Sequence, residues 1–212
     1  MNIINITTYL LALLFWPISH KFFVYLLNGR TEIGKNINHF LHALIYVFLY
    51  KIIPYHVKYL ILVSIAFYTF DTGYIMNELY KEISSYKRQL PYLIHHGIAI
   101  YGLYLAYTDY YTEIVMYFYY LLEYSNFMLY ISYHIQKSYP NNRSLQLVSQ
   151  SLQLVWYSYF RIIRFLVYLY KIWPIFLETT ATVKTMFVSL FIMGFYWSFN
   201  LFKKCKKEIK LD

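Results

Sequence analysis

Side chains that can transfer protons lie inside long apolar runs of this sequence. The string LPYLIHHGIAIYG holds the adjacent His95 and His96, and the string YYLLEYSNFMLY holds Glu123. An ionisable side chain in such a run is costly unless it faces a protected interior, so each one is a functional-site hypothesis. A histidine there can serve as a general base or a nucleophile, because burial beside a carboxylate tunes the pKa of its imidazole.

Other ionisable residues interrupt the neighbouring apolar runs. His39 and His42 are three residues apart, so they share one face of a helix. His95 and His96 are adjacent and point about 100° apart on a helix. One of them can therefore line a cavity while the other bonds to a neighbouring helix. The remaining ionisable residues of these runs are Asp71 and Glu78, seven apart, and Arg161 and Arg164, three apart.

Each of these polar residues also has a purely structural explanation. The histidines can be neutral groups that hydrogen-bond between helices. Glu123 or Asp71 can form an ion pair with Arg161 or Arg164, which would make the carboxylate architectural. The residues alone leave both the functional and the structural explanation open.

Several familiar chemistries do not fit the sequence. Membrane oxidases with two irons need several imidazole ligands for each iron, whereas this chain has 7 histidines and one HxxH spacing, from His39 to His42. No HExxH, GxSxG or glycine-rich phosphate loop occurs. A metal site built from His42, His96 and Glu123 is conceivable, but we expect no metal. The single cysteine, Cys205, excludes an intramolecular disulfide and is at most a palmitoylation candidate.

The composition shows what must position these residues. Of the 212 residues, 59% are hydrophobic and 14% are charged, which is more apolar than a soluble domain of this length can bury. The excess must face lipid. The net charge of +9 is scattered between the apolar runs and forms no single stripe, so we expect no nucleic-acid partner.

About 20 apolar residues cross a bilayer, and the sequence divides into about seven such segments. We therefore predict an all-α, polytopic membrane protein. Pro91 is expected in the first turn of the fourth helix, where its missing N–H costs nothing. The predicted segments are Ile6–Leu27, Ile37–Ile53, Lys58–Leu79, Pro91–Tyr107, Thr112–Ile135, Ser149–Trp173 and Lys184–Phe202.

The basic residues between the segments predict the orientation. Cytosolic loops of membrane proteins carry an excess of lysine and arginine, so we expect the C-terminus in the cytosol. The opposite side holds only Lys51, Lys58, Lys171 and Lys184. The cytosolic side would hold Lys21, Arg30, Lys35, Lys81, Lys87, Arg88, Lys137, Arg143, Lys203, Lys204, Lys206, Lys207 and Lys210.

The order of the polar strings resembles the TLC-domain family of the TRAM, Lag and CLN type. The matching strings cover roughly residues 33 to 202: NHFLHALIY with His42, AFYTFDTGYIM with Asp71, LIHHGIAIYG with the double histidine, LLEYSNFML with Glu123 and Ser125, and YSYFRIIRFLVY with Arg161. The resemblance implies a TLC-like transmembrane domain at 33–203. An N-terminal anchor and loop would precede it at 1–32, and a basic cytosolic tail would follow at 204–212.

The resemblance also implies a lipid-related function in the endoplasmic reticulum or another endomembrane. In ceramide synthases of this family a histidine pair is associated with acyl transfer, so His95 and His96 are the catalytic candidates. His42, Asp71, Glu123, Ser125 and Arg161 become the lipid-binding or polar-interior set. Synthases have a His-Asp pair and further aspartates after the double histidine, whereas this chain reads MYFYYLLEYSNFM, which is more similar to the non-synthase branch.

Three functions follow as hypotheses. The first is a lipid role such as binding, sensing, trafficking or control of membrane composition. The second is an acyl-CoA-dependent N-acyltransferase, with acyl-CoA as co-substrate and Asp71 or Glu123 orienting the imidazole. The third is a membrane interaction protein without chemistry. The expected partners are membrane lipids, a homo-oligomer is compatible with the sequence, and no cofactor is expected.

Overall fold

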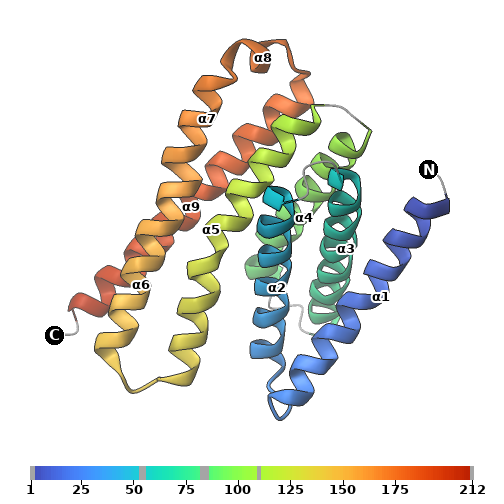
Figure 1. The fold of residues 1–212 in the computed structure, drawn as a ribbon. Helices are drawn as coiled ribbons and strands as arrows, with labels where there is room; N and C mark the ends of the chain where they lie inside the picture. The colour runs from blue at the N-terminus through green and yellow to red at the C-terminus, as the bar shows by residue number, and fades with distance from the viewer. Residues whose placement is uncertain (1–2, 53–55, 82–85, 109–110, 211–212) are drawn as a thin grey trace. The chain divides into compact units, whose positions relative to one another are not determined.

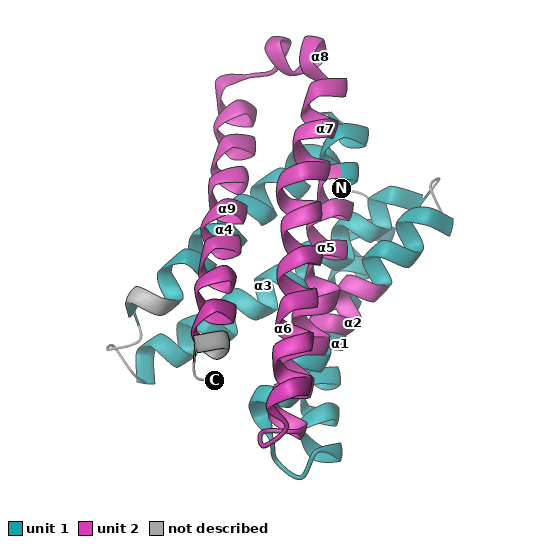
Figure 2. Cartoon of the chain, turned by 90° about the vertical axis from the view of Figure 1, so that its left-hand side faces the viewer, with its two compact units in different colours: residues 1–38, 45–117 teal, residues 39–44, 118–212 magenta. Residues whose placement is uncertain are grey.

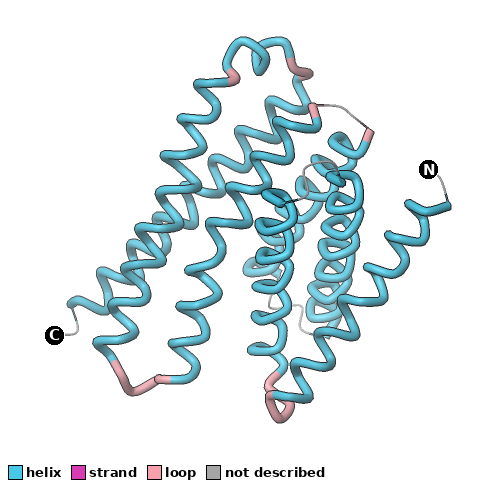
Figure 3. The backbone as a smooth tube through the Cα atoms, viewed as in Figure 1, coloured by secondary structure: helices cyan, strands magenta, loops and turns pink. Residues whose placement is uncertain are grey.

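The computed structural model of the chain describes residues 3–52, 56–81, 86–108 and 111–210. Within these ranges the chain is helical apart from short connections, and no β-strand occurs (Figure 3). The elements labelled in Figure 1, with the π-helix η3 between α6 and α7, are α1 (Ile3–Leu26), α2 (Thr31–Ile52), α3 (Val57–Lys81), α4 (Tyr86–Tyr107), α5 (Thr112–Ser138), α6 (Arg143–Ser158), η3 (Tyr159–Arg164), α7 (Phe165–Lys171), α8 (Trp173–Glu178) and α9 (Ala181–Lys210).

The described part of each predicted segment lies almost entirely within a helix or a continuous helical run, while several helix ends lie outside the predicted limits. The prediction for Pro91 was wrong, because α4 begins at Tyr86 and the proline lies inside it. Hydropathy detects only the apolar part of a helix, and residues 86–90 are mostly polar. The proline removes one backbone hydrogen bond without ending the helix.

The surface of the helices is apolar, as expected for a protein in lipid. Among the described residues, three stretches are long and apolar enough to cross a membrane: α1, α3 and residues Ala181–Lys207 of α9. Many large apolar side chains are exposed, among them Leu11 and Ile18 on α1 and Ile192 on α9. So many exposed apolar side chains would be unfavourable on a surface in contact with water. The all-α, polytopic membrane class is therefore confirmed, and the number of seven spans stays a prediction.

The chain divides into two compact units, which Figure 2 draws in different colours. Unit 1 comprises residues 1–38 and 45–117. In it α3 packs against both α1 and α4. Trp16 of α1 is fully buried, its indole lies 4.9 Å from the Phe67 ring, and its Nε1 donates to the Val63 carbonyl at 3.2 Å.

Unit 2 comprises residues 39–44 and 118–212. Its core is formed where α6 and η3 pack along α9, and Phe165 of α7 contacts Phe187 and Phe191 of the same helix. The ring of Phe118 lies 4.7 Å from Phe165 and 4.6 Å from Phe187, so α5 joins the same aromatic core. Cys205 of α9 is buried, which leaves its thiol poorly placed for palmitoylation.

Candidate functional site

Unit 1 contains a buried imidazole that lies between a carboxylate and a hydroxyl. The Nε2 atom of His96 lies 3.4 Å from Oδ2 of Asp71, and its Nδ1 atom lies 3.4 Å from Oγ1 of Thr72. The two partners are neighbours on α3, while the histidine comes from α4. Asp71 and His96 are buried. A polar contact of this kind is favoured where lipid and packed side chains exclude water.

Thr72 differs from other helical threonines of this chain. Thr7, Thr69 and Thr185 each return their hydroxyl to the carbonyl four residues earlier, the usual partner of threonine in a helix. The Thr72 hydroxyl instead contacts His96 on the next helix.

The other oxygen of Asp71 faces a lysine. Nζ of Lys35 lies 3.6 Å from Oδ1 of Asp71 and 4.0 Å from Oε2 of Glu78, and it sits 4.4 Å from the centre of the Tyr74 ring. The Lys35 side chain is 25% exposed, whereas that of Asp71 is 2% exposed. Lys35 thus reaches from the edge of the unit to the buried carboxylate, which is balanced by cationic or ionisable groups on both oxygens.

Both histidines of the double-histidine string pack on one aromatic ring. The ring of Tyr68 lies 6.4 Å from His95 and 5.3 Å from His96, and the two imidazoles are 5.7 Å apart. Both histidines are buried. The structure therefore places neither at an exposed surface, and it brings His96 to Asp71.

Unit 2 contains a second buried imidazole and carboxylate. Nδ1 of His42, from the short stretch of α2 that belongs to this unit, lies 3.7 Å from Oε2 of Glu123 on α5. Both side chains are almost completely buried. Of the two arginines considered as ion-pair partners of Glu123, Arg161 was wrong, because its guanidinium turns to neutral acceptors. An ion pair with Arg164 stays a prediction.

Arg161 lies in the π-helix η3 and reaches α5. Its Nε donates to Oγ of Ser125 at 2.7 Å, and its Nη2 donates to the Leu122 carbonyl at 3.3 Å and to Oδ1 of Asn126 at 3.1 Å. The polar patch after Glu123 thus serves as a set of acceptors for this arginine. A π-helix within an α-helical run is rare and often marks a functional position.

The sequence could not show which side chains pair across helices or which further residues contact each pair. In unit 1, Lys35 contacts Asp71 and Thr72 contacts His96, and neither Lys35 nor Thr72 was predicted as a site residue. For Lys35 a signal existed, because a long lysine stem near the end of a helix reaches several residues inward. No group of three or more His, Cys, Asp or Glu side chains in the described ranges is arranged to hold a metal ion.

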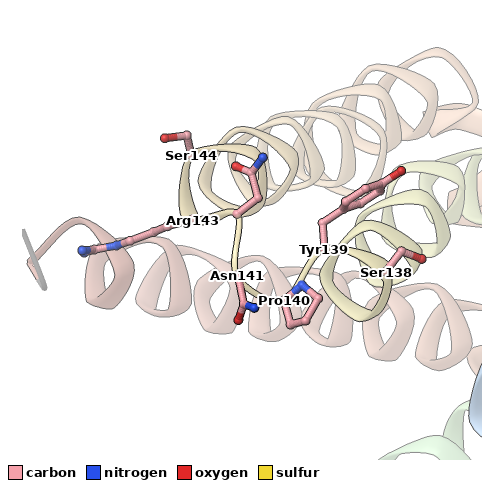
Figure 4. A pocket seen from close by; sticks show the side chains of 7 residues that line it. Ser138, Tyr139, Pro140, Asn141, Arg143 and Ser144 are labelled. Carbon is pink, nitrogen blue, oxygen red and sulfur yellow. The ribbon is translucent and has the colours of Figure 1, made fainter.

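A pocket lies at the turn between α5 and α6. It has a volume of about 590 Å³ and contains none of the predicted site residues (Figure 4). Nε2 of Gln146 donates to the carbonyls of Tyr139 and Pro140, and Oδ1 of Asn142 caps α6 by accepting from the Leu145 N–H. These bonds explain the shape of the turn without a ligand. The pocket is lined by Ser138, Tyr139, Pro140, Asn141, Asn142, Arg143 and Ser144.

An all-helical chain with an apolar surface and buried ionisable residues is a polytopic membrane protein. The chain belongs to the TLC-domain family, whose model, the TLC domain, matches residues 12–203. No curated protein and no solved structure matches the chain significantly.

Proposed function

We propose that this TLC-domain protein acts on or binds membrane lipids through its buried polar residues and belongs to the branch that does not make ceramide. One observation carries the proposal: His96, inside an apolar helix, is placed between Asp71 and Thr72. A membrane protein retains such costly groups where a polar ligand or a reaction needs them. We further propose residence in the endoplasmic reticulum or another endomembrane, with the C-terminus in the cytosol.

The contacts of His96 assign its nitrogens. A carboxylate only accepts hydrogen bonds, so in the neutral imidazole Nε2 carries the proton and faces Asp71. Nδ1 is then the acceptor and faces the Thr72 hydroxyl. A ligand with an amine or hydroxyl group would meet His96 on the Thr72 side, while Asp71 fixes the orientation of the ring.

This arrangement also favours acyl transfer as a second candidate function. The acceptor nitrogen or oxygen of a lipid would attack the thioester carbonyl of acyl-CoA, so a bond to carbon forms and the carbon–sulfur bond breaks. The proton lost by the acceptor would pass to Nδ1 of His96 and then to the leaving thiolate. Asp71 would act as a positioning residue for the imidazole.

Comparative lipid mass spectrometry tests the proposal. Membranes with matched levels of the wild type, His95→Ala, His96→Ala, Asp71→Asn and Thr72→Val should be compared with membranes lacking the protein. We expect one lipid class to change with the wild type and to revert in His96→Ala and Asp71→Asn, and partly in Thr72→Val. Thr69→Val is the matched control, because Thr69 bonds only to the carbonyl of its own helix.

The outcomes separate the candidates. An acylated lipid that rises only with an intact His96 supports acyl transfer, whereas a lipid that copurifies with the wild type and is lost in the variants supports binding. Identical lipid profiles and identical copurifying lipids in all samples contradict a lipid function and favour an interaction protein in which the histidines are packing groups.

A further inference from the structure

Arg161 carries a buried positive charge whose hydrogen-bond acceptors are all neutral. They are a hydroxyl, a backbone carbonyl and an amide oxygen, contributed by Ser125, Leu122 and Asn126. The residue is 3% exposed, and a guanidinium remains charged at any pH that a protein tolerates. A charge in an apolar interior is costly unless an opposite charge accompanies it.

Within the described part of unit 2, no carboxylate lies at ion-pair distance from this guanidinium. Glu123 is the nearest acidic residue along α5, and its observed ionisable partner is His42. The third nitrogen of Arg161, Nη1, is buried and meets no hydrogen-bond acceptor among the described residues. The charge therefore lacks an anionic partner, and the donors on Nη1 lack an acceptor.

A second buried polar group without a partner lies on the helix that covers Arg161. Gly194 of α9 packs directly on the arginine, since a Cβ atom there would lie 3.2 Å from the Cβ of Arg161. Ser198 follows four residues later and so shares the face of α9 that includes Gly194. Its hydroxyl is buried and has no hydrogen-bond partner in the described structure.

The lipid-facing surface lies next to these groups. Ile163 in the same π-helix is 54% exposed, and Phe195, the neighbour of Gly194, is 56% exposed. The ring of Tyr157 lies 5.1 Å from the guanidinium carbon and covers one of its faces. Two buried donors, one on Arg161 and one a helical turn beyond its contact with Gly194, thus lie near apolar side chains at the surface. This combination suits a ligand that has one charged end and an acyl chain.

We propose that Arg161 and Ser198 bind the oxyanion, phosphate or carboxylate, of a lipid. A guanidinium nitrogen and a hydroxyl are both donors to such an oxygen, and a charge-assisted bond would supply the missing negative partner. This inference rests on the proposed lipid function and specifies the chemical class of the ligand. It concerns residues of unit 2, whereas the contacts of His96 belong to unit 1.

Thermal unfolding of the full-length protein in neutral detergent tests the inference. Dioleoyl phosphatidic acid, oleate, dioleoylglycerol and inorganic phosphate are added separately to the wild type, Arg161→Gln, Ser198→Ala and Arg164→Gln. We expect phosphatidic acid or oleate to raise the unfolding midpoint of the wild type on the order of 5 °C at saturating concentration. The shift should vanish in Arg161→Gln, fall in Ser198→Ala and persist in Arg164→Gln, which removes one charge from the same π-helix.

The wild-type samples alone can overturn the inference, even if Arg161→Gln does not fold. An equal shift with dioleoylglycerol would show that an oxyanion is not required, and an equal shift with inorganic phosphate would show that the ligand is not a lipid. A shift retained in Arg161→Gln would place the anion elsewhere. If the lipid profile depends on His96 while none of the anions shifts unfolding, this inference fails and the proposed function stands.

Discussion

At the scale of single residues, His42 and Glu123 form a buried pair in which each side chain depends on the other. Replacing His42 by leucine removes the imidazole 3.7 Å from Oε2 of Glu123. The carboxylate then stays in an apolar environment without this partner, which costs on the order of 3 kcal/mol in the free energy of unfolding. We expect a clear fall in the unfolding midpoint of His42→Leu in detergent.

A double-mutant cycle makes this prediction specific. Glu123→Gln removes the charge, so the double variant should be more stable than the sum of the two single effects implies. His39→Leu is the matched control, because His39 lies on the same face of α2, is only partly buried and contacts the Tyr130 ring at 6.1 Å. Additive effects of His42→Leu and Glu123→Gln would show that the pair does not act as a unit.

Which residues are buried and polar could be predicted from the sequence, whereas their partners could not. Asp71, His96 and Glu123 were each recognisable, because an ionisable side chain interrupts a long apolar run. Their pairing depends on which helices are neighbours, and hydropathy contains no information on helix order. Glu123 was therefore matched with Arg161 or Arg164 by charge alone, and its contact with His42 was not foreseen.

At the scale of helices, the corner between α1 and α2 depends on a close approach at Gly34. A Cβ atom at this position would lie 2.7 Å from Cγ2 of Val24 and 3.1 Å from its backbone nitrogen. The side chain of Val24 can rotate but its backbone cannot move without shifting α1. We expect Gly34→Ala to lower the free energy of unfolding by about 1 to 3 kcal/mol.

Gly73 on α3 provides the comparison for Gly34, because an added Cβ atom there meets no atom within 4 Å. Gly73→Ala should leave stability unchanged or raise it by up to about 1 kcal/mol, since alanine is the better helix former. Thermal unfolding of the two variants in the same detergent checks both expectations. Equal midpoints for Gly34→Ala and Gly73→Ala would contradict the role of the close approach.

Helices were easier to predict than their ends and irregularities. Apolar length identified the central part of every predicted segment, because a bilayer imposes that length. Polar ends such as residues 86–90 lie beyond this signal, so the start of α4 was missed. The π-helix Tyr159–Arg164 was also missed, because apolar length does not distinguish a π-turn from an α-turn.

At the scale of the whole molecule, the basic residues at the end of α9 should hold the C-terminus in the cytosol. The last turns of α9, a helix apolar enough to cross the membrane, carry four exposed lysines: Lys203, Lys204, Lys206 and Lys207. Replacing all four by glutamine should give a mixed or inverted C-terminus, because positive charge retains a segment on the cytosolic side. A C-terminal glycosylation reporter measures the orientation.

Two basic residues that are predicted to lie on the opposite side provide the control for topology. Lys171→Gln with Lys184→Gln also removes positive charge, but the charge bias predicts that this change leaves the orientation intact or strengthens it. A four-lysine variant with unchanged topology and altered lipid content would indicate that the end of α9 binds anionic lipid instead.

At this scale, composition alone established the membrane class. The number of spans and their orientation depend on the basic residues and on where each segment ends, and hydropathy gives little information on either.

The π-helix has a consequence for how related chains are aligned. Each residue of an α-helix turns the chain by about 100°, so one additional residue within η3 rotates everything after it by that angle relative to α6. A helical wheel drawn through residues 143–171 as a single α-helix would mix inner and outer faces. A relative with an uninterrupted α-helix here would be one residue shorter, and an alignment without a gap between Ser158 and Phe165 would equate Arg161 with a residue on another face.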